Sequence, residues 1–174
     1  MIALKAIFLQ VYWFYAVYYG PKIHDLWIAL PCLAIVTMNF IIYKPKITSL
    51  RYIFLVILFS LYGFFQDYIF VKTGVLSYNE NYLPVWINTL FWVFIVYYGD
   101  IFNYLAKMNK ILLALIGGIG GCMAYLGGSR LGSIEHGEMV VFFAGVFISW
   151  AIFFPLSIWL WYESPIGANH EKSA

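Results

Sequence analysis

Acidic, amide and basic side chains are rare in this sequence, and a few of them interrupt long apolar runs. Gln66 and Asp67 stand side by side within the run GFFQDYIFV, and Arg130 follows a glycine-rich apolar run. An ionisable group at the apolar centre of a membrane costs about 3 kcal/mol or more, so such residues are functional candidates. A carboxylate can act as a general base, and a guanidinium pairs with an anion. These residue types therefore indicate a site that binds a polar or anionic group.

The candidate site combines acid–base groups with groups that bind or orient a substrate. The candidate catalytic residues are Asp67, His136 and Tyr78, with Asp67 or His136 as the base and Tyr78 as an orienting donor. Asp67 and Arg130 also allow a structural alternative, in which their ion pair only locks two helices together. The candidate substrate-binding residues are amides, charged side chains and aromatic rings from several segments: Gln10, Trp13, Gln66, Trp86, Asn88, Tyr125, Arg130 and Glu135.

No metal or nucleotide cofactor is predicted for this site. The sequence contains no His-x-x-x-His or Cys-x-x-Cys spacing of the kind that binds zinc. The glycine-rich run does not match the dinucleotide-binding pattern, because Met123 stands where the third glycine is required after Gly118 and Gly120. Any chemistry must then rest on side chains alone, and the residues do not decide whether the protein is an enzyme.

The composition places these residues in a membrane protein. The chain of 174 residues is 64% hydrophobic and 10% charged, whereas soluble domains have about 25% charged residues. Apolar runs of about 20 residues have the length that crosses a bilayer as a helix. We predict an all-α integral membrane protein with one six-helix transmembrane domain over residues 1–163 and a polar cytoplasmic tail at residues 164–174. The six predicted helices are residues 4–19, 25–43, 50–71, 84–105, 110–128 and 138–162.

The basic residues predict how the helices are oriented. Lys and Arg are enriched on the cytoplasmic side of membrane proteins. Seven basic residues fall on the side that holds both chain ends and three on the other, which predicts that both termini are cytoplasmic and that Asp67 lies near the outer side. The first group is Lys5, Lys44, Lys46, Arg51, Lys107, Lys110 and Lys172, and the second is Lys22, Lys72 and Arg130.

Glycines are concentrated in the fifth predicted helix and just after it. Seven of the 14 glycines lie between Gly117 and Gly132. Each lowers helix propensity by about 1 kcal/mol in water, whereas in lipid small residues let neighbouring helices approach closely. We therefore predict that this helix lies at the centre of the bundle. In the loop at residues 72–83, Val75, Leu76 and Tyr78 are expected to fold back onto the bundle as a short plug.

Several motifs, taken in order, resemble one protein family. They are Phe8-x-Gln10-x-x-Trp13-Phe14, Asp67 with Gly74-Val75-Leu76-x-Tyr78, Pro84-x-Trp86, and Gly117-x-x-Gly120-Gly121-x-x-Ala124-Tyr125 with Gly128 and Leu131-Gly132. Their order and spacing are similar to an uncharacterised bacterial inner-membrane family, domain of unknown function 2878, from about Phe8 to Pro155. Cys122 departs from the family pattern, in which proline follows the double glycine. The resemblance implies a multi-pass protein of the bacterial inner membrane with no established activity.

Three functions are compatible with these features. In the first, the protein handles lipids, as a lipid-modifying enzyme or its membrane partner, and the glycine-faced helix leaves a groove for acyl chains. In the second, it is a small-solute or ion transporter that acts as a homo-oligomer, although no inverted repeat supports this. In the third, it is a non-catalytic scaffold whose glycine face docks a partner protein. The predicted partners are membrane lipids and either a second copy or a membrane protein, with no nucleic acid because no basic run is present.

Overall fold

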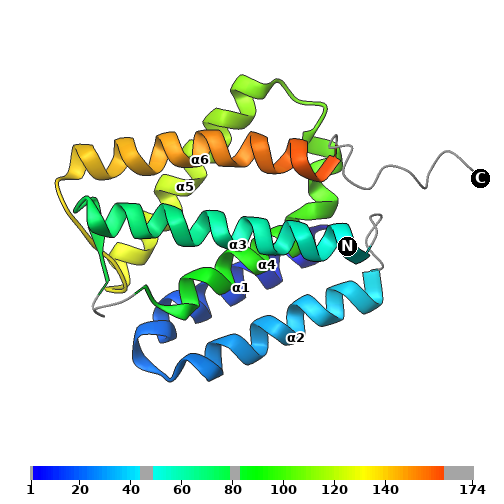
Figure 1. Cartoon of the computed structure of the whole chain (residues 1–174), viewed down its shortest axis with the longest axis horizontal. Helices are drawn as coiled ribbons and strands as arrows, with labels where there is room; N and C mark the ends of the chain where they lie inside the picture. The colour runs from blue at the N-terminus through cyan, green and yellow to red at the C-terminus, as the bar shows by residue number, and fades with distance from the viewer. Residues whose placement is uncertain (1, 44–48, 79–82, 163–174) are drawn as a thin grey trace, which may run out of the picture.

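The computed structural model describes residues 2–43, 49–78 and 83–162, and within these ranges the chain forms six long α-helices (Figure 1). The predicted apolar runs match the helices to within two residues at each end, which confirms the all-α class. The predicted tail at residues 164–174 lies outside the described residues. The helices are α1 (Ile2–Tyr19), α2 (Asp25–Tyr43), α3 (Ser49–Lys72), α4 (Val85–Leu105), α5 (Lys110–Arg130) and α6 (Met139–Tyr162), and a short 3₁₀ helix, η1 (Gly20–Lys22), joins α1 to α2.

The helix ends follow from residues that stop or cap helices. Pro21 falls in η1 and ends α1, since proline lacks the backbone N–H that would continue the helix. Pro84 stands in extended backbone directly before α4. The side chain of Asn109 caps α5 by accepting a hydrogen bond of 2.8 Å from the Ile111 backbone N–H. After α5, Gly132 has a φ of 76°, a left-handed conformation that glycine adopts readily.

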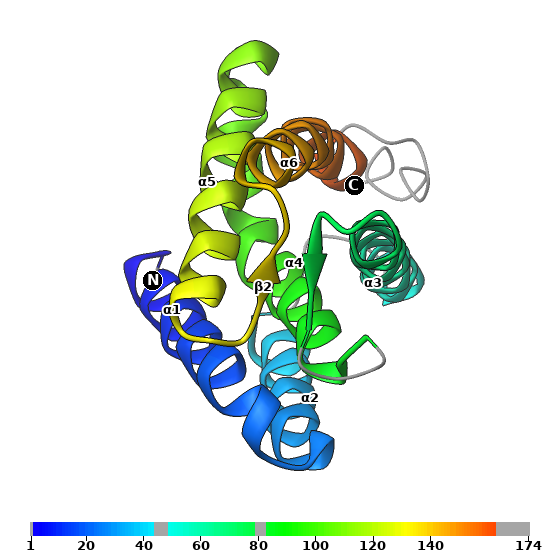
Figure 2. The same ribbon diagram turned by 90° about the vertical axis from the view of Figure 1, so that its left-hand side faces the viewer.

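Helix α4 lies at the middle of the bundle (Figure 2), and it packs against α1, α2, α3 and α6. Its Val93 and Ile95 side chains are fully buried. The glycine-rich α5 lies at one edge and packs mainly along α6. The prediction that α5 is the central helix is therefore wrong. Its glycines approach α6 closely at Gly117, Gly118 and Gly121 and meet Trp13 of α1 at Gly127, but helices do not surround α5.

Aromatic side chains of α6 occupy the glycine face of α5. A Cβ atom added to Gly117 would overlap Phe154, and one added to Gly121 would overlap Trp150. At Gly118 the added atom would lie 2.6 Å from the ring of Phe147. Real side chains essentially never show such distances, so these three positions require glycine for the helices to pack as they do. This interface explains three of the seven glycines between Gly117 and Gly132.

A two-stranded ribbon joins two loops at one end of the bundle. Strand β1 (Leu76–Ser77) pairs antiparallel with β2 (Glu135–His136), so that the α3–α4 loop is held against the α5–α6 loop. We call this end, where α1, α3 and α5 finish, the ribbon end. Val75, Leu76 and Tyr78 are buried, which confirms the predicted plug.

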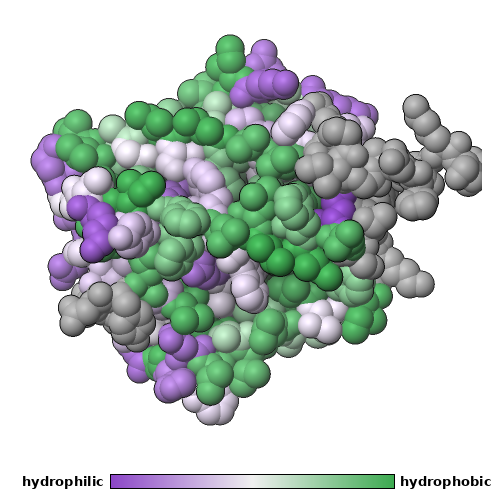
Figure 3. All heavy atoms as spheres, viewed as in Figure 1, coloured by the Kyte–Doolittle hydropathy of each residue, from purple (hydrophilic) through white to green (hydrophobic). Residues whose placement is uncertain are grey.

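Three of the described helices are long and apolar enough to cross a membrane. They cover residues Leu50–Lys72, Lys110–Arg130 and Met139–Tyr162, while α2 and α4 contain shorter apolar stretches. Hydrophobic side chains dominate the face shown in Figure 3, and hydrophilic ones gather mainly toward its margins. The chain therefore has the features of an integral membrane protein. Six crossings and cytoplasmic termini stay predictions.

Candidate functional site

An apolar groove of about 680 Å³ lies between α1, α4, α5 and α6. Leu9 of α1, Leu90 and Phe94 of α4, and Ile116 of α5 contribute to its walls. Ligand sites in proteins are typically apolar concavities of about 300–1,000 Å³. The size and lining of the groove therefore suit a small, largely apolar molecule.

The groove is narrow at the ribbon end and wider away from it. At the ribbon end the Trp13 ring packs against Gly127, where an added Cβ atom would lie 2.8 Å from the indole. The Ser133 hydroxyl also donates a hydrogen bond to the Val17 carbonyl there. Farther along α5, an atom added to Gly120 would have nothing within 4 Å. Helices α1 and α5 thus touch at the ribbon end and separate toward the other end.

Gln10 places an amide in the wall of this groove. It lies on the same face of α1 as Trp13, and both side chains line the groove. Its side chain is exposed, and it makes no hydrogen bond among the residues that the structure describes. An amide in apolar surroundings gains from a hydrogen-bonding partner. Gln10 is therefore available to a polar group of a bound molecule.

A network of buried hydrogen bonds lies directly behind the groove and joins α3 to α5 and α6. The Tyr125 hydroxyl donates to Asp67 Oδ1 at 2.5 Å and accepts from Gln66 Nε2 at 2.7 Å. Gln66 Oε1 accepts from the Ser149 hydroxyl at 2.6 Å, and the Tyr62 and Ser149 hydroxyls lie 2.7 Å apart. Tyr125 also lines the groove, so it connects the network to the groove wall.

The partner of Asp67 is a tyrosine and not a cation. Asp67 is fully buried, whereas Arg130 is exposed at the end of α5. In the described part of the chain no ion pair joins them, so the alternative in which an Asp67–Arg130 ion pair locks the two helices together is wrong. The link between α3 and α5 is instead the Tyr125 hydrogen bond.

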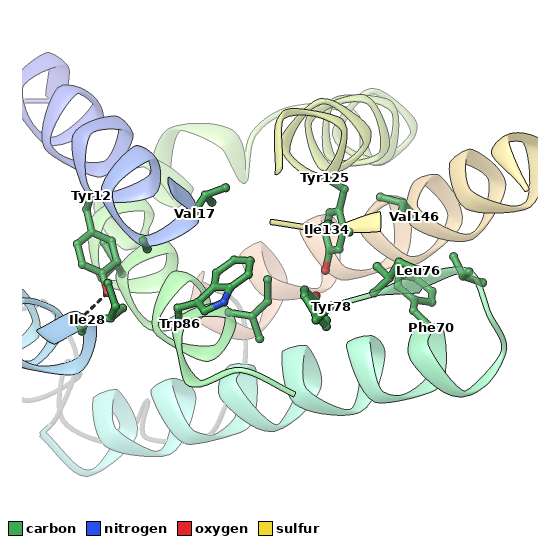
Figure 4. Close-up of a cluster of buried hydrophobic side chains, with 14 of the residues drawn as sticks. Tyr12, Val17, Ile28, Phe70, Leu76, Tyr78, Trp86, Tyr125, Ile134 and Val146 are labelled. Atoms are coloured by element: carbon green, nitrogen blue, oxygen red, sulfur yellow. Dashed lines mark hydrogen bonds between the residues drawn. The ribbon is translucent and has the colours of Figure 1, made fainter. Parts of the chain in front are cut away.

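Tyr78 lies beside this network. Its hydroxyl points toward that of Tyr125 (Figure 4), and it is close enough to interact with Asp67. Within the described residues, neither the Tyr78 hydroxyl nor Asp67 Oδ2 has a hydrogen-bond partner. Burial, and then the nearby carboxyl of Asp67, raise the pKa of Tyr78 well above its ordinary value. Tyr78 is therefore a protonated hydroxyl that can donate a hydrogen bond.

Of the remaining predicted site residues, Trp86 lies at the groove, and Asn88, Glu135 and His136 lie outside it. Trp86 is buried and lines the groove, and its ring meets Tyr78 edge-on at 5.7 Å. Asn88 is half-buried, lies outside the groove lining and has an Oδ1 atom with no partner among the described residues. Glu135 is exposed on β2, and the His136 ring packs against Phe142 at 5.2 Å.

The structure thus divides the predicted residues into three groups. One group lines the groove, one forms the buried network, and one lies outside both. No hydrogen bond among the described residues joins His136 to the network. The groove is lined by Gln10, Trp13, Trp86, Tyr125 and Arg130. The network consists of Gln66, Asp67 and Tyr125, with Tyr78 beside them. The residues outside both are Asn88, Glu135 and His136. The catalytic roles assigned to Asp67, Tyr78 and His136 stay predictions.

Two members of the network are not among the predicted site residues. Ser149 is a polar residue within the long apolar run of α6, and Tyr62 lies one turn before Gln66 on α3. A hydroxyl inside an apolar span is the signal that points to Ser149, as it does to Ser157 on the same helix, because such a group needs a partner in lipid. In the described part of the chain, no three His, Cys, Asp or Glu residues are arranged to hold a metal ion.

The fold and the site define a helical membrane protein with an apolar groove in its side and a buried polar network behind the groove wall. The chain belongs to a family described as "Protein of unknown function (DUF2878)", whose model matches residues 2–156. This match confirms the resemblance seen in the motifs. No curated protein and no solved structure matches the chain.

Proposed function

We propose that this protein binds a membrane lipid, with the hydrocarbon chain held in the groove between α1 and α5. The groove of about 680 Å³ is the observation that carries this proposal. Phe14 and Met123 on its rim are 52% and 70% exposed, so the groove opens at the side of the bundle, where lipid tails would lie. In this proposal six helices cross the bacterial inner membrane and both chain ends face the cytoplasm.

The lining favours binding of a lipid over its chemical modification. Gln10 and Arg130 are the strongly polar residues in the described groove lining, and neither is a good general base. Asp67 is fully buried behind Tyr125, so it has no direct path to a molecule in the groove. We therefore infer that the Asp67–Tyr125 pair holds the groove wall in place.

The scaffold function receives less support from the same geometry. A partner protein that docks on the glycine face of α5 needs that face to be open. Phe154, Phe147 and Trp150 of α6 already pack against Gly117, Gly118 and Gly121. The transporter and the homo-oligomer stay predictions.

Filling the groove at Gly120 tests the proposal. Tryptophan at Gly120 is expected to occupy the groove, because open space surrounds this position. The amount of lipid that co-purifies with the protein should fall about tenfold, which corresponds to about 1.4 kcal/mol. The measurement is mass spectrometry of lipids bound to the purified, detergent-solubilised protein.

The matched control is Ile119→Trp, on the neighbouring residue. Ile119 is 55% exposed and lies outside the groove lining, so its ring should point away from the groove. This variant should retain as much lipid as the wild type. Wild-type lipid retention by a folded Gly120→Trp protein would refute lipid binding in this groove.

A further inference from the structure

Polar groups, not apolar walls, must decide which lipid the groove selects. A hydrocarbon chain in the bilayer is already in apolar surroundings, so moving it into an apolar groove provides little hydrophobic driving force. Selectivity must then come from hydrogen bonds and charge. In the described lining, Arg130 can supply a charge and Gln10 can supply hydrogen bonds from an uncharged amide.

Arg130 offers a positive charge at the ribbon end of the groove. It is the last residue of α5, its side chain is exposed, and it lines the groove. No acidic side chain in the described part of the chain forms an ion pair with it. A planar guanidinium binds a phosphate or carboxylate through two parallel hydrogen bonds. The charge of Arg130 therefore complements an anionic head group.

Gln10 lies deeper along the same groove. Helices α1 and α5 both run toward the ribbon end and touch where Trp13 meets Gly127. Gln10 precedes Trp13 by three residues and Arg130 follows Gly127 by three, so each lies about 4.5 Å along its helix from this contact, on opposite sides. Both residues line the groove, so a molecule in it meets a cation at the ribbon end and an uncharged amide on the other side of the contact.

This order matches the chemical order of an ester-linked anionic lipid. Such a lipid has an acidic head group, then ester carbonyls and then a hydrocarbon chain. The amide N–H of Gln10 can donate to an ester carbonyl. Beyond Gln10, the open space at Gly120 leaves room for the chain.

We infer that the groove selects an anionic glycerophospholipid, with its phosphate on Arg130, an ester carbonyl on Gln10 and an acyl chain along α5. This inference rests on the proposed lipid-binding function and adds the class of lipid. A free fatty acid also has an anionic head group but has no ester carbonyl. It would therefore need Arg130 alone, whereas a glycerophospholipid would use both Arg130 and Gln10.

To test this inference, the detergent-solubilised protein is mixed with equal amounts of phosphatidylglycerol, phosphatidylcholine and oleic acid. The lipid that remains bound is then identified by native mass spectrometry. The wild type should retain phosphatidylglycerol about tenfold over phosphatidylcholine. Arg130→Gln should lose this preference and still bind lipid. Lys72→Gln is the matched control, because Lys72 is an exposed cation at the ribbon end that lies outside the groove lining.

A second comparison tests the role of Gln10. The wild type should retain ester-linked phosphatidylglycerol over its ether-linked analogue, and Gln10→Leu should retain both equally. Three results would each overturn the inference and leave lipid binding intact. They are equal retention of phosphatidylglycerol and phosphatidylcholine by the wild type, an unchanged preference in Arg130→Gln, and enrichment of oleic acid. Absence of any bound lipid would overturn the proposed function itself.

Discussion

Leucine at Gly121 is expected to separate α5 from α6 and to lower the free energy of unfolding by about 3 kcal/mol, at the upper end of the usual range for overpacking. A Cβ atom at this position already overlaps Trp150. The indole cannot easily retreat, because its ring packs against Phe91 at 5.7 Å and Phe94 at 5.6 Å. The larger leucine must therefore move a whole helix.

The neighbouring glycine provides the control for this prediction. Gly120 has no atom within 4 Å of an added Cβ, so Gly120→Leu should change the free energy of unfolding by no more than about 1 kcal/mol, including the gain in helix propensity. The measurement is thermal unfolding in detergent followed by circular dichroism. Equal stability of Gly121→Leu and Gly120→Leu would show that Gly121 of α5 does not pack on Trp150 of α6.

The positions of the helices follow from the sequence because the signals are local. Apolar runs set the length of each helix, and breaking or capping residues such as Pro21 and Asn109 set the ends. The plug formed by Val75 and Leu76 follows in the same way, since an apolar loop too short to span the membrane must pack on the bundle. Each of these inferences needs only neighbouring residues.

The neighbours of α5 do not follow from the sequence in this way. A glycine indicates that something approaches closely, but it does not say how many helices do so. In this fold the aromatic side chains of α6 pack on Gly117, Gly118 and Gly121, whereas Gly127 meets Trp13 of α1. The number of neighbours depends on side chains that lie more than twenty residues away in the sequence.

The partner of Asp67 depends on rotation about the α5 axis. Tyr125 and Arg130 are five residues apart, which separates them by about 140° around a helix. Only one of them can face α3, and the sequence does not say which. The structure turns Tyr125 toward Asp67 and leaves Arg130 at the groove. The same uncertainty applies to His136, whose direction depends on the pairing of β2 with β1.

Removal of the Tyr125 hydroxyl is expected to be the second large effect. In Tyr125→Phe, Asp67 Oδ1 and Gln66 Nε2 both lose their hydrogen bond to this hydroxyl. A buried polar group without a partner costs about 1–3 kcal/mol. With two such groups, the variant should lose about 2–6 kcal/mol in the free energy of unfolding, measured by the same thermal unfolding assay. Tyr68→Phe is the matched control, because Tyr68 on α3 is 45% exposed and should change little.

A double-mutant cycle separates this network from a general packing defect. If Tyr125 and Asp67 act through their 2.5 Å hydrogen bond, the losses in Tyr125→Phe and in Asp67→Leu, which removes the acceptor, should not add, and the coupling energy should be about 1–3 kcal/mol. Losses that add to within about 0.5 kcal/mol would show that the two residues act independently. Because Tyr125 also lines the groove, its loss should reduce lipid retention as well as stability. Gly120→Trp, in contrast, should reduce lipid retention alone, so the two variants together distinguish the space that holds the lipid from the network that supports its wall.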